Sequence, residues 1–137
     1  MFLVDTNVVS EMRKAERGNP GVVSWATGTH PRLMFISVIS LYEVEIGVLR
    51  AERSDQIKGT MLRAWLETGL KPTFANRILD VDLEVSMLAA GLHVPDPAPL
   101  RDSLIGATAI AHGLTVVTRD VRDFTRFPDL EVLNPWT

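Results

Sequence analysis

Short apolar runs alternate with longer amphipathic stretches along the whole chain. The short runs, rich in β-branched and other apolar residues, predict strands at Phe2–Val4, Leu33–Ser37, Arg77–Val81, Thr115–Thr118 and Leu130–Leu133. The stretches between them predict helices at Thr6–Lys14, from Pro20 after an Asn19 cap, at Val38–Glu52, from Ser54 through Leu66, from an Asp82 cap to about His93, and at Asp102–His112, closed by Gly113. Strands that alternate with helices are typical of right-handed crossovers and of a parallel sheet with helices on both faces.

This alternation predicts an α/β fold, a three-layer α/β/α domain with a central parallel sheet. The chain has 137 residues, close to the usual size of one domain, and we expect residues 1–137 to form a single domain. The chain is 46% hydrophobic with both signs of charge mixed, which excludes a disordered protein. The Val38–Glu52 helix is apolar on nearly every face, so we expect it to be deeply packed.

Acidic residues stand where a parallel sheet gathers its ligands, at and just beyond the carboxyl ends of the strands. Asp5 follows the first strand directly, and Asp120 closely follows the Thr115–Thr118 strand. Asp102 lies in the first turn of its helix, and Glu43 lies on the helix after the second strand. We therefore expect these carboxylates to gather at one edge of the sheet.

Carboxylates gathered in this way repel one another and raise each other's pKa unless a cation neutralises them. Mg²⁺ and Mn²⁺ prefer oxygen ligands, and such an ion can activate water and stabilise the departing oxygen of a phosphodiester. The chain has no cysteine, which excludes a zinc–thiolate site, a disulfide scaffold and a cysteine nucleophile. The pattern therefore favours Mg²⁺ or Mn²⁺ held by carboxylates.

Each acid also has a purely structural interpretation. Asp5 with Thr6 could simply cap the first helix, and Asp102 could simply complement a helix dipole. Asp120 and Asp123 compete for one role, since either could also cap a short helix there. The residues alone leave these alternatives open.

The Val38–Glu52 helix offers two glutamates in similar surroundings. Glu43 and Glu45 both have apolar neighbours three and four positions away. A carboxylate on an apolar helix face is costly unless it is paired or binds a metal. Periodicity alone leaves open which of the two enters the site.

Charge and the remaining polar residues narrow the partners. With 17 acids against 14 bases the formal charge is −3, so the chain does not hold nucleic acid through bulk positive charge. The histidines His30, His93 and His112 lack metal-ligand spacing, and we expect none of them to be catalytic. No apolar run is long enough for a signal peptide or a membrane span, which predicts a cytoplasmic protein without membrane contact.

Four segments carry the acids in a specific order. They are Leu3–Glu11 with Asp5, Ile36–Gly47 with Glu43, Leu100–Ala109 with Asp102, and Leu114–Asp120 with the following Asp123–Phe124. In this order, and followed by Leu133–Trp136, they resemble the motifs of the PIN-domain family, specifically VapC-type toxins of the FitB-like branch. The glutamate of that family stands four residues before a glycine, so the resemblance favours Glu43, before Gly47, over Glu45.

This resemblance implies a metal-dependent endoribonuclease that uses Mg²⁺, or alternatively Mn²⁺. It implies the toxin of a type II toxin–antitoxin system, which cleaves transfer or ribosomal RNA and so inhibits translation. The metal-binding catalytic residues would be Asp5, Glu43, Asp102 and Asp120, with Asp123 as the rival for the fourth position.

The resemblance also implies supporting residues and partners. Thr6, Asn7 and Thr118 would orient the carboxylates or a bound water. The partners would be a VapB-type antitoxin, whose tail enters the active-site groove, and a second copy in a homodimer, with Trp65 on the dimer or antitoxin surface. With four acids assigned to metal, 13 acids face 14 bases, mostly arginines, so the net charge is compatible with an RNA substrate.

Proteins of other classes fit the chain less well. A phosphoacceptor receiver domain needs a lysine after its last core strand, but the last lysine here is Lys71. A haloacid-dehalogenase-type phosphatase needs an acid two residues after its first aspartate, where this chain has Asn7. A catalytically inactive PIN-fold binding protein remains the alternative, and metal binding would separate it from the enzyme.

Overall fold

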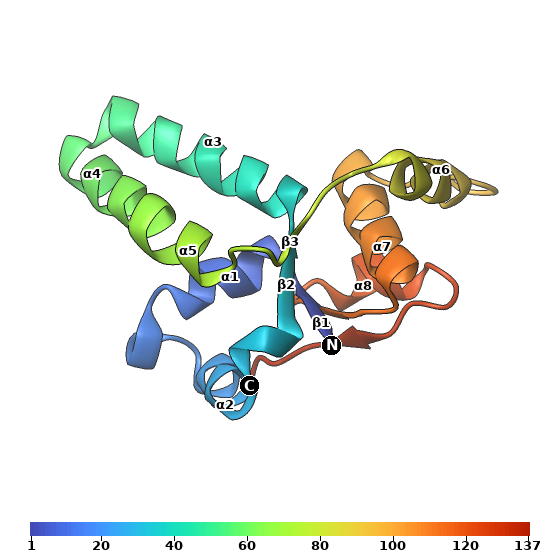
Figure 1. The fold of residues 1–137 in the computed structure, drawn as a ribbon, viewed down its shortest axis with the longest axis horizontal. Helices are drawn as coiled ribbons and strands as arrows, with labels where there is room; N and C mark the ends of the chain where they lie inside the picture. The colour runs from blue at the N-terminus through green and yellow to red at the C-terminus, as the bar shows by residue number, and fades with distance from the viewer.

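The computed structural model describes all 137 residues and is built around a sheet of five strands. The strands lie in the order β3-β2-β1-β4-β5, and every neighbouring pair is parallel (Figure 1). Their bounds are Phe2–Val4 (β1), Met34–Ser37 (β2), Ile78–Leu79 (β3), Thr115–Val117 (β4) and Val132–Leu133 (β5). The predicted α/β fold with a central parallel sheet is confirmed.

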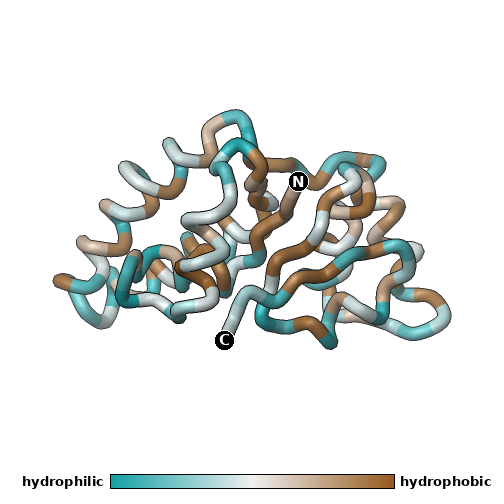
Figure 2. The backbone as a smooth tube through the Cα atoms, turned by 90° about the horizontal axis from the view of Figure 1, so that it is seen from below, coloured by the Kyte–Doolittle hydropathy of each residue, from teal (hydrophilic) through white to brown (hydrophobic).

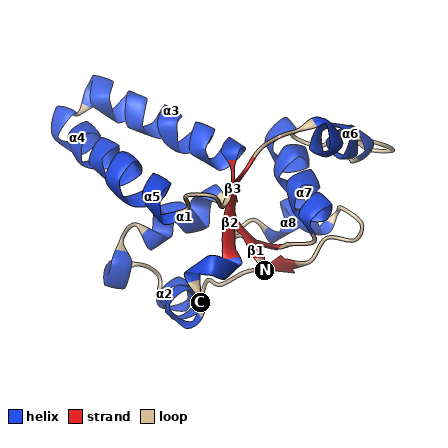
Figure 3. Cartoon of the chain, viewed as in Figure 1, coloured by secondary structure: helices blue, strands red, loops and turns tan.

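Helices cover both faces of the sheet and complete three layers (Figure 3). One side carries α1 (Thr6–Met12), α2 (Pro20–Gly28), α3 (Val38–Ser54), α4 (Gln56–Ala64) and α5 (Lys71–Thr73). The other side carries α6 (Leu83–Gly91), α7 (Leu100–His112) and α8 (Val121–Thr125). Short 3-10 turns lie at Ala15–Arg17 and Pro31–Leu33, and π-helical turns at Trp65–Leu70 join α4 to α5. None of these helices combines the length and the apolar character that a membrane span requires.

Successive strand residues point to opposite faces of the sheet and build two cores. Leu3 packs with Ile105 of α7, whereas its neighbour Val4 packs with Val8 of α1 and Val44 of α3. This alternation, together with helices on both faces, buries the strands on both sides. In Figure 2 the strands at the centre of the molecule are accordingly coloured hydrophobic.

The residues that predicted helix ends make capping contacts. The Asn19 side chain accepts a hydrogen bond from the backbone N–H of Gly21 at the start of α2. The Asp82 carboxylate accepts one from the N–H of Val85 in α6, at 2.9 Å. Gly113 ends α7 with a φ of +64°, a left-handed conformation that suits glycine. Local capping chemistry therefore accounts for these three boundaries.

Helix α3 is less buried than expected. Tyr42 is 65% exposed and Leu49 is 53% exposed, and the buried residues of the helix are Ser40, Val44, Val48 and Ala51. Its main packing partner is α4, and the two helices extend together away from the sheet (Figure 1). The expectation of a deeply packed helix is wrong, because apolar residues on the outer face of α3 find no other helix to cover them.

Several predicted boundaries also move by a few residues. Helix α1 ends at Met12 rather than Lys14, and α7 begins at Leu100, ahead of Asp102. The helix expected from Ser54 through Leu66 is divided, because its regular turns stop at Ala64. The bounds of α7 matter most for function, because they place residue 101 inside the first helical turn.

The strand order creates a switch point at the centre of the sheet. Strand β1 pairs with β2 on one side and with β4 on the other, so the chain leaves β1 in one direction and later returns on its opposite flank. In open parallel sheets, ligands bind at the carboxyl ends of the strands at such a point. Asp5 directly follows β1 here, and its N–H donates to the carbonyl of Val117 in β4 at 2.9 Å.

Candidate active site

Asp5 is fully buried at the end of β1. Its Oδ1 accepts from the N–H of Thr6 at 2.8 Å, which makes Asp5 the N-cap of α1. Its Oδ2 accepts from the hydroxyl of Thr118, just after β4, also at 2.8 Å. The cap and the chemical role therefore do not exclude each other, because one carboxylate ends the strand, starts the helix and faces the site.

Glu43 reaches the same place from α3. Its Oε1 accepts from the hydroxyl of Thr6 at 2.6 Å, and that hydroxyl lies 3.0 Å from the Ser40 hydroxyl. Burial opposes the charged form of Glu43, but hydrogen bonds from Arg101 and Thr6 outweigh burial and hold the pKa of Glu43 below its usual value. Glu45 instead pairs with Arg63 at 2.7 Å. The two glutamates that periodicity could not separate thus face different neighbours.

Asp102 completes a group of three carboxylates from the first turn of α7, where it is 4% exposed. Burial raises the pKa of Asp102, and pairing with Arg101 offsets only part of that increase. The negative charges of Asp123 and Asp5 raise it further. The acids therefore lie close enough for their charges to raise one another's pKa, as expected for clustered carboxylates.

Asp120 and Asp123 lie at the outer edge of the same hollow, and both are exposed. The Asn7 amide donates to Oδ2 of Asp120 at 3.0 Å. Asp120 occupies the N-cap position of α8 without making a side-chain cap bond. No hydrophobic residue lines this hollow, which is formed by Thr6, Asn7, Ser10, Glu43, Pro99, Arg101, Asp102, Asp120 and Asp123.

Arg101 is the site residue that sequence reasoning missed. It lies next to Asp102 in the first turn of α7 and ion-pairs with Asp5 at 2.7 Å, Glu43 at 2.8 Å and Asp102 at 3.0 Å. One signal could have revealed it, because a positive charge in the first turn of a helix opposes the helix dipole. An arginine there needs a nearby acid, and the carboxylates of the site supply three.

The supporting and aromatic residues occupy two distinct environments. Thr118 is fully buried and donates to Asp5, whereas the Asn7 amide donates to both Thr118 and Asp120. Trp65 packs at the edge of the core, with Arg13 over its ring at 5.9 Å. Both residues line a groove that runs from the acids along α3 and α4, with Glu43 and Thr6 at one end.

Histidine has no place among the acids. His93 lies 3.1 Å from the hydroxyl of Ser103 through Nε2 and accepts from the N–H of Ala98 through Nδ1. His30 caps the 3-10 turn before β2 by accepting from the N–H of Arg32. These contacts hold loops in place away from the acids. The side chains of the site that could bind a metal ion therefore do so through oxygen.

The donor set fits Mg²⁺ or Mn²⁺, which take carboxylate oxygens and water. Asp5, Glu43 and Asp102 already converge on one positive group, the guanidinium of Arg101. In this arrangement no group of three acidic or imidazole side chains is set to hold a metal ion. The carboxylates therefore fit such an ion in donor type and lie at one place, although Arg101 holds their oxygens in this arrangement.

Comparison with known proteins agrees with the fold and with the family that the sequence resembles. A family model described as PIN domain matches residues 2–130. The toxin FitB of Neisseria gonorrhoeae is 36% identical, with 99% of each chain covered. The VapC ribonuclease Y4jK of Sinorhizobium fredii is 32% identical, with 99% of this chain and 98% of that protein covered.

A solved structure extends this similarity to three dimensions. The crystal structure of FitAcB from Neisseria gonorrhoeae superposes with a TM-score of 0.88 at 35% identity, covering 99% of each chain. The structure of FitAB bound to a DNA fragment matches with the same TM-score of 0.88. The chain therefore belongs to the PIN-domain family, in its group of VapC- and FitB-type toxin ribonucleases.

Proposed function

We propose that this chain is a Mg²⁺- or Mn²⁺-dependent endoribonuclease and the toxin of a type II toxin–antitoxin system. The proposal rests mainly on one observation: three carboxylates converge on the guanidinium of Arg101 at the switch point of the sheet. They belong to Asp5, Glu43 and Asp102. The relatives named VapC ribonuclease and toxin FitB cover nearly the whole chain and support the same activity. On this view residues 1–137 act as one PIN domain.

Asp5, Glu43 and Asp102 would hold the metal ion. When bound, the ion supplies positive charge that activates water and stabilises the departing oxygen of a phosphodiester. Thr118 and Thr6 would orient the carboxylates, because the hydroxyl of each donates a hydrogen bond to an acid of the site. Orienting contacts of this kind are worth about 10- to 100-fold in metal affinity or activity in other metal sites.

Asp120 is our proposal for the fourth acid, and Asp123 is its rival. The amide of Asn7 holds the carboxylate of Asp120 at the rim of the hollow. Asp123 lies close enough for its charge to raise the pKa of Asp102. Asp120 is preferred because the Asn7 amide bonds both Asp120 and Thr118, and Thr118 in turn bonds Asp5.

The substrate that we propose is a transfer or ribosomal RNA in the cytoplasm. The groove beside the acids carries basic residues, Arg13, Arg50 and Lys58, which could contact phosphates. These bases lie near the site although the chain as a whole has a net charge of −3. Bound metal would add further positive charge where the reacting phosphate must lie.

The partners that we propose are a VapB-type antitoxin and a second copy of the chain. The antitoxin is supported by the similarity to FitAB, a toxin–antitoxin complex that was solved on DNA. A homodimer is supported by exposed apolar residues on the outer faces of α3 and α4, including Tyr42, Leu49, Ile57 and Met61. Trp65 would then contribute to the antitoxin surface through the groove that it lines.

Expression in a bacterial host beside the Asp5→Asn variant tests the toxin activity. We expect the wild-type chain to arrest growth and the variant not to do so, and we expect the purified protein to cleave RNA with Mg²⁺ or Mn²⁺ but not in excess EDTA. Arrest by both proteins, or by neither together with no metal-dependent cleavage, would contradict the nuclease. Saturable Mn²⁺ binding separates the enzyme from a catalytically inactive PIN-fold protein, which does not need the ion.

A further inference from the structure

Arg101 spreads its guanidinium over all three inner carboxylates. Its Nε and Nη2 donate to the two oxygens of Glu43, each at 2.8 Å. Its Nη2 also donates to Oδ1 of Asp5 at 2.7 Å, and its Nη1 donates to Oδ1 of Asp102 at 3.0 Å. It is the only basic side chain that pairs with these acids. Arg101 therefore supplies one positive charge that offsets part of the negative charge of these three acids.

Arg101 occupies at least one oxygen of each carboxylate that would hold the metal ion. Oδ2 of Asp5 is turned toward the Thr118 hydroxyl, so Oδ1 is the oxygen that faces Arg101. A Mg²⁺ ion binds oxygen at about 2.1 Å and would bring a second positive charge among the same acids. The guanidinium and the ion would compete for these oxygens, because both are positive and like charges repel.

The open hollow beside the acids offers space for the Arg101 side chain. Its side chain is 31% exposed and lines the open hollow together with Asn7, Ser10 and Pro99. A planar guanidinium is well suited to bidentate contact with a phosphate. Because its backbone is anchored in α7, a displaced Arg101 stays within side-chain reach of the phosphate that the site would bind.

We propose that Arg101 competes with the divalent cation for Asp5, Glu43 and Asp102, and that after displacement it binds the substrate phosphate. This inference rests on the proposed metal-dependent function. Two consequences follow. Arg101 weakens metal binding to the free protein, because only the fraction of molecules with Arg101 displaced is competent to bind. It also makes metal and phosphate binding mutually favourable, because each ligand stabilises the displaced position.

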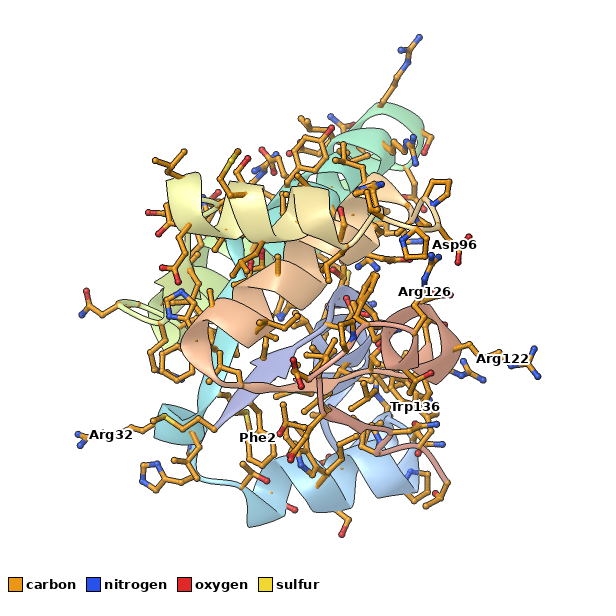
Figure 4. All side chains as sticks on the ribbon, turned by 90° about the vertical axis from the view of Figure 1, so that its right-hand side faces the viewer. Phe2, Arg32, Asp96, Arg122, Arg126 and Trp136 are labelled. Atoms are coloured by element: carbon orange, nitrogen blue, oxygen red, sulfur yellow. The ribbon has the colours of Figure 1, made fainter.

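Titration of the purified full chain with Mn²⁺ tests the competition. We expect Arg101→Ala to bind Mn²⁺ about 10-fold or more tightly than the wild-type chain, as holds when the competent fraction is a tenth or less. Arg32→Ala is the matched control, since it also removes one arginine but lies far from the site, where Arg32 points into solvent (Figure 4). It should bind Mn²⁺ as the wild-type chain does.

The second role is tested with inorganic phosphate as the probe. We expect Mn²⁺-loaded wild-type protein and Arg32→Ala to bind phosphate with equal affinity, and Mn²⁺-loaded Arg101→Ala to bind it about 10-fold more weakly, the loss of one charged contact. Equal or weaker Mn²⁺ binding by Arg101→Ala would overturn the competition. Equal phosphate affinity of all three proteins would overturn the phosphate role.

Two further measurements keep the inference separate from folding and from the proposed function. If Arg101→Ala does not fold, Arg101→Gln keeps most of the stem, and the Arg101 Nε–H resonance of the wild-type chain should shift on titration with Mg²⁺. An unmoved resonance at saturating Mg²⁺ would contradict displacement. Asp5→Asn separates the two proposals: if no protein binds Mn²⁺ in a way that Asp5→Asn abolishes, both fail, whereas Asp5-dependent binding with unchanged affinity in Arg101→Ala overturns only the role of Arg101.

Discussion

Two arginines in this protein each hold three carboxylates, and the two clusters differ in where those carboxylates lie. Arg63 joins α3 to the following helical turns through the surface cluster, which contains Glu45, Glu52 and Glu67. Arg101 holds the site cluster, which contains Asp5, Glu43 and Asp102. The two arginine side chains are similarly exposed, at 28% and 31%. The carboxylates are 42%, 38% and 43% exposed in the surface cluster and 0%, 29% and 6% in the site cluster.

The two clusters contain the same number of acids but differ in how far those acids are buried. We infer that burial distinguishes the candidate active site from the structural ion network on the surface. Water can solvate the surface acids when Arg63 is absent, so that cluster costs little to open. Asp5 and Asp102 have little access to water, so they depend on a cation. On our proposal the site cluster can exchange Arg101 for a metal ion, whereas the surface cluster only fastens helices together.

The largest expected effect on stability comes from removing each arginine in turn. In EDTA, Arg101→Ala should lower the free energy of unfolding by about 2 kcal/mol, because buried charges lose their partner, with a discount for the partial exposure of the arginine. Arg63→Ala should leave it nearly unchanged. Denaturant unfolding of both variants measures the difference. Equal losses in the two variants would contradict the distinction between the clusters.

A smaller effect should come from the acids outside the Arg101 contacts. Asp120→Asn should reduce metal-dependent RNA cleavage about 10-fold, the lower end for groups that orient a metal site. Asp123→Asn should reduce it less, because Asn7 bonds Asp120 and not Asp123. Initial cleavage rates of the two variants rank the acids. A greater loss in Asp123→Asn would give Asp123 the fourth position.

The smallest expected effect is on how stability changes with pH, and its sign should be opposite for an acid of each cluster. Burial raises the pKa of Asp102 in the folded state. Its favourable contribution to stability is then fully present below its unfolded value of 3.8 and is lost as pH rises through the folded pKa. In EDTA at pH 7, Asp102→Asn should therefore raise the free energy of unfolding slightly, because the neutral amide avoids the cost of a buried charge. This gain should vanish at a pH below 3.8.

Glu67 of the surface cluster provides the opposite case. A hydrogen bond from Lys71 lowers the pKa of Glu67, so its contribution is present above its unfolded value of 4.5 and is lost as pH falls through the folded pKa. Glu67→Gln should therefore lower the free energy of unfolding slightly at pH 7. Denaturant unfolding from pH 3 to 7 compares both variants with the wild-type chain, and slopes of the same sign would contradict the comparison.

Much of the fold could be predicted from the sequence because the strands and caps are local features. A short apolar run indicated β1 and a β-branched run indicated β4, and Asn19, Asp82 and Gly113 marked helix ends that the structure has. The exposure of α3 could not be predicted, because it depends on which helices lie beside it. The π-helical turns at Trp65–Leu70 were also missed, since periodicity does not distinguish them from α-helix.

The site was predictable only in part, because some of its contacts join residues far apart in the chain. Asp5 could be placed from its position directly after a strand. The choice of Glu43 over Glu45 needed the family resemblance, since both lie on one helix with similar neighbours. The role of Arg101 could not be predicted, because it depends on contacts with Asp5 and Glu43, which are 96 and 58 positions away in the chain.

The most direct test of the central claim compares one glutamate from each cluster on the same helix. Purified wild-type, Glu43→Gln and Glu45→Gln proteins are assayed for RNA cleavage with Mn²⁺ and with EDTA. We predict cleavage by the wild-type chain and Glu45→Gln with Mn²⁺ only, and a loss on the order of 100-fold or more in Glu43→Gln, as for other groups that stabilise charge in a transition state. Equal cleavage by Glu43→Gln and Glu45→Gln, or undiminished cleavage in EDTA, would contradict the assignment of the site cluster as the metal-dependent active site.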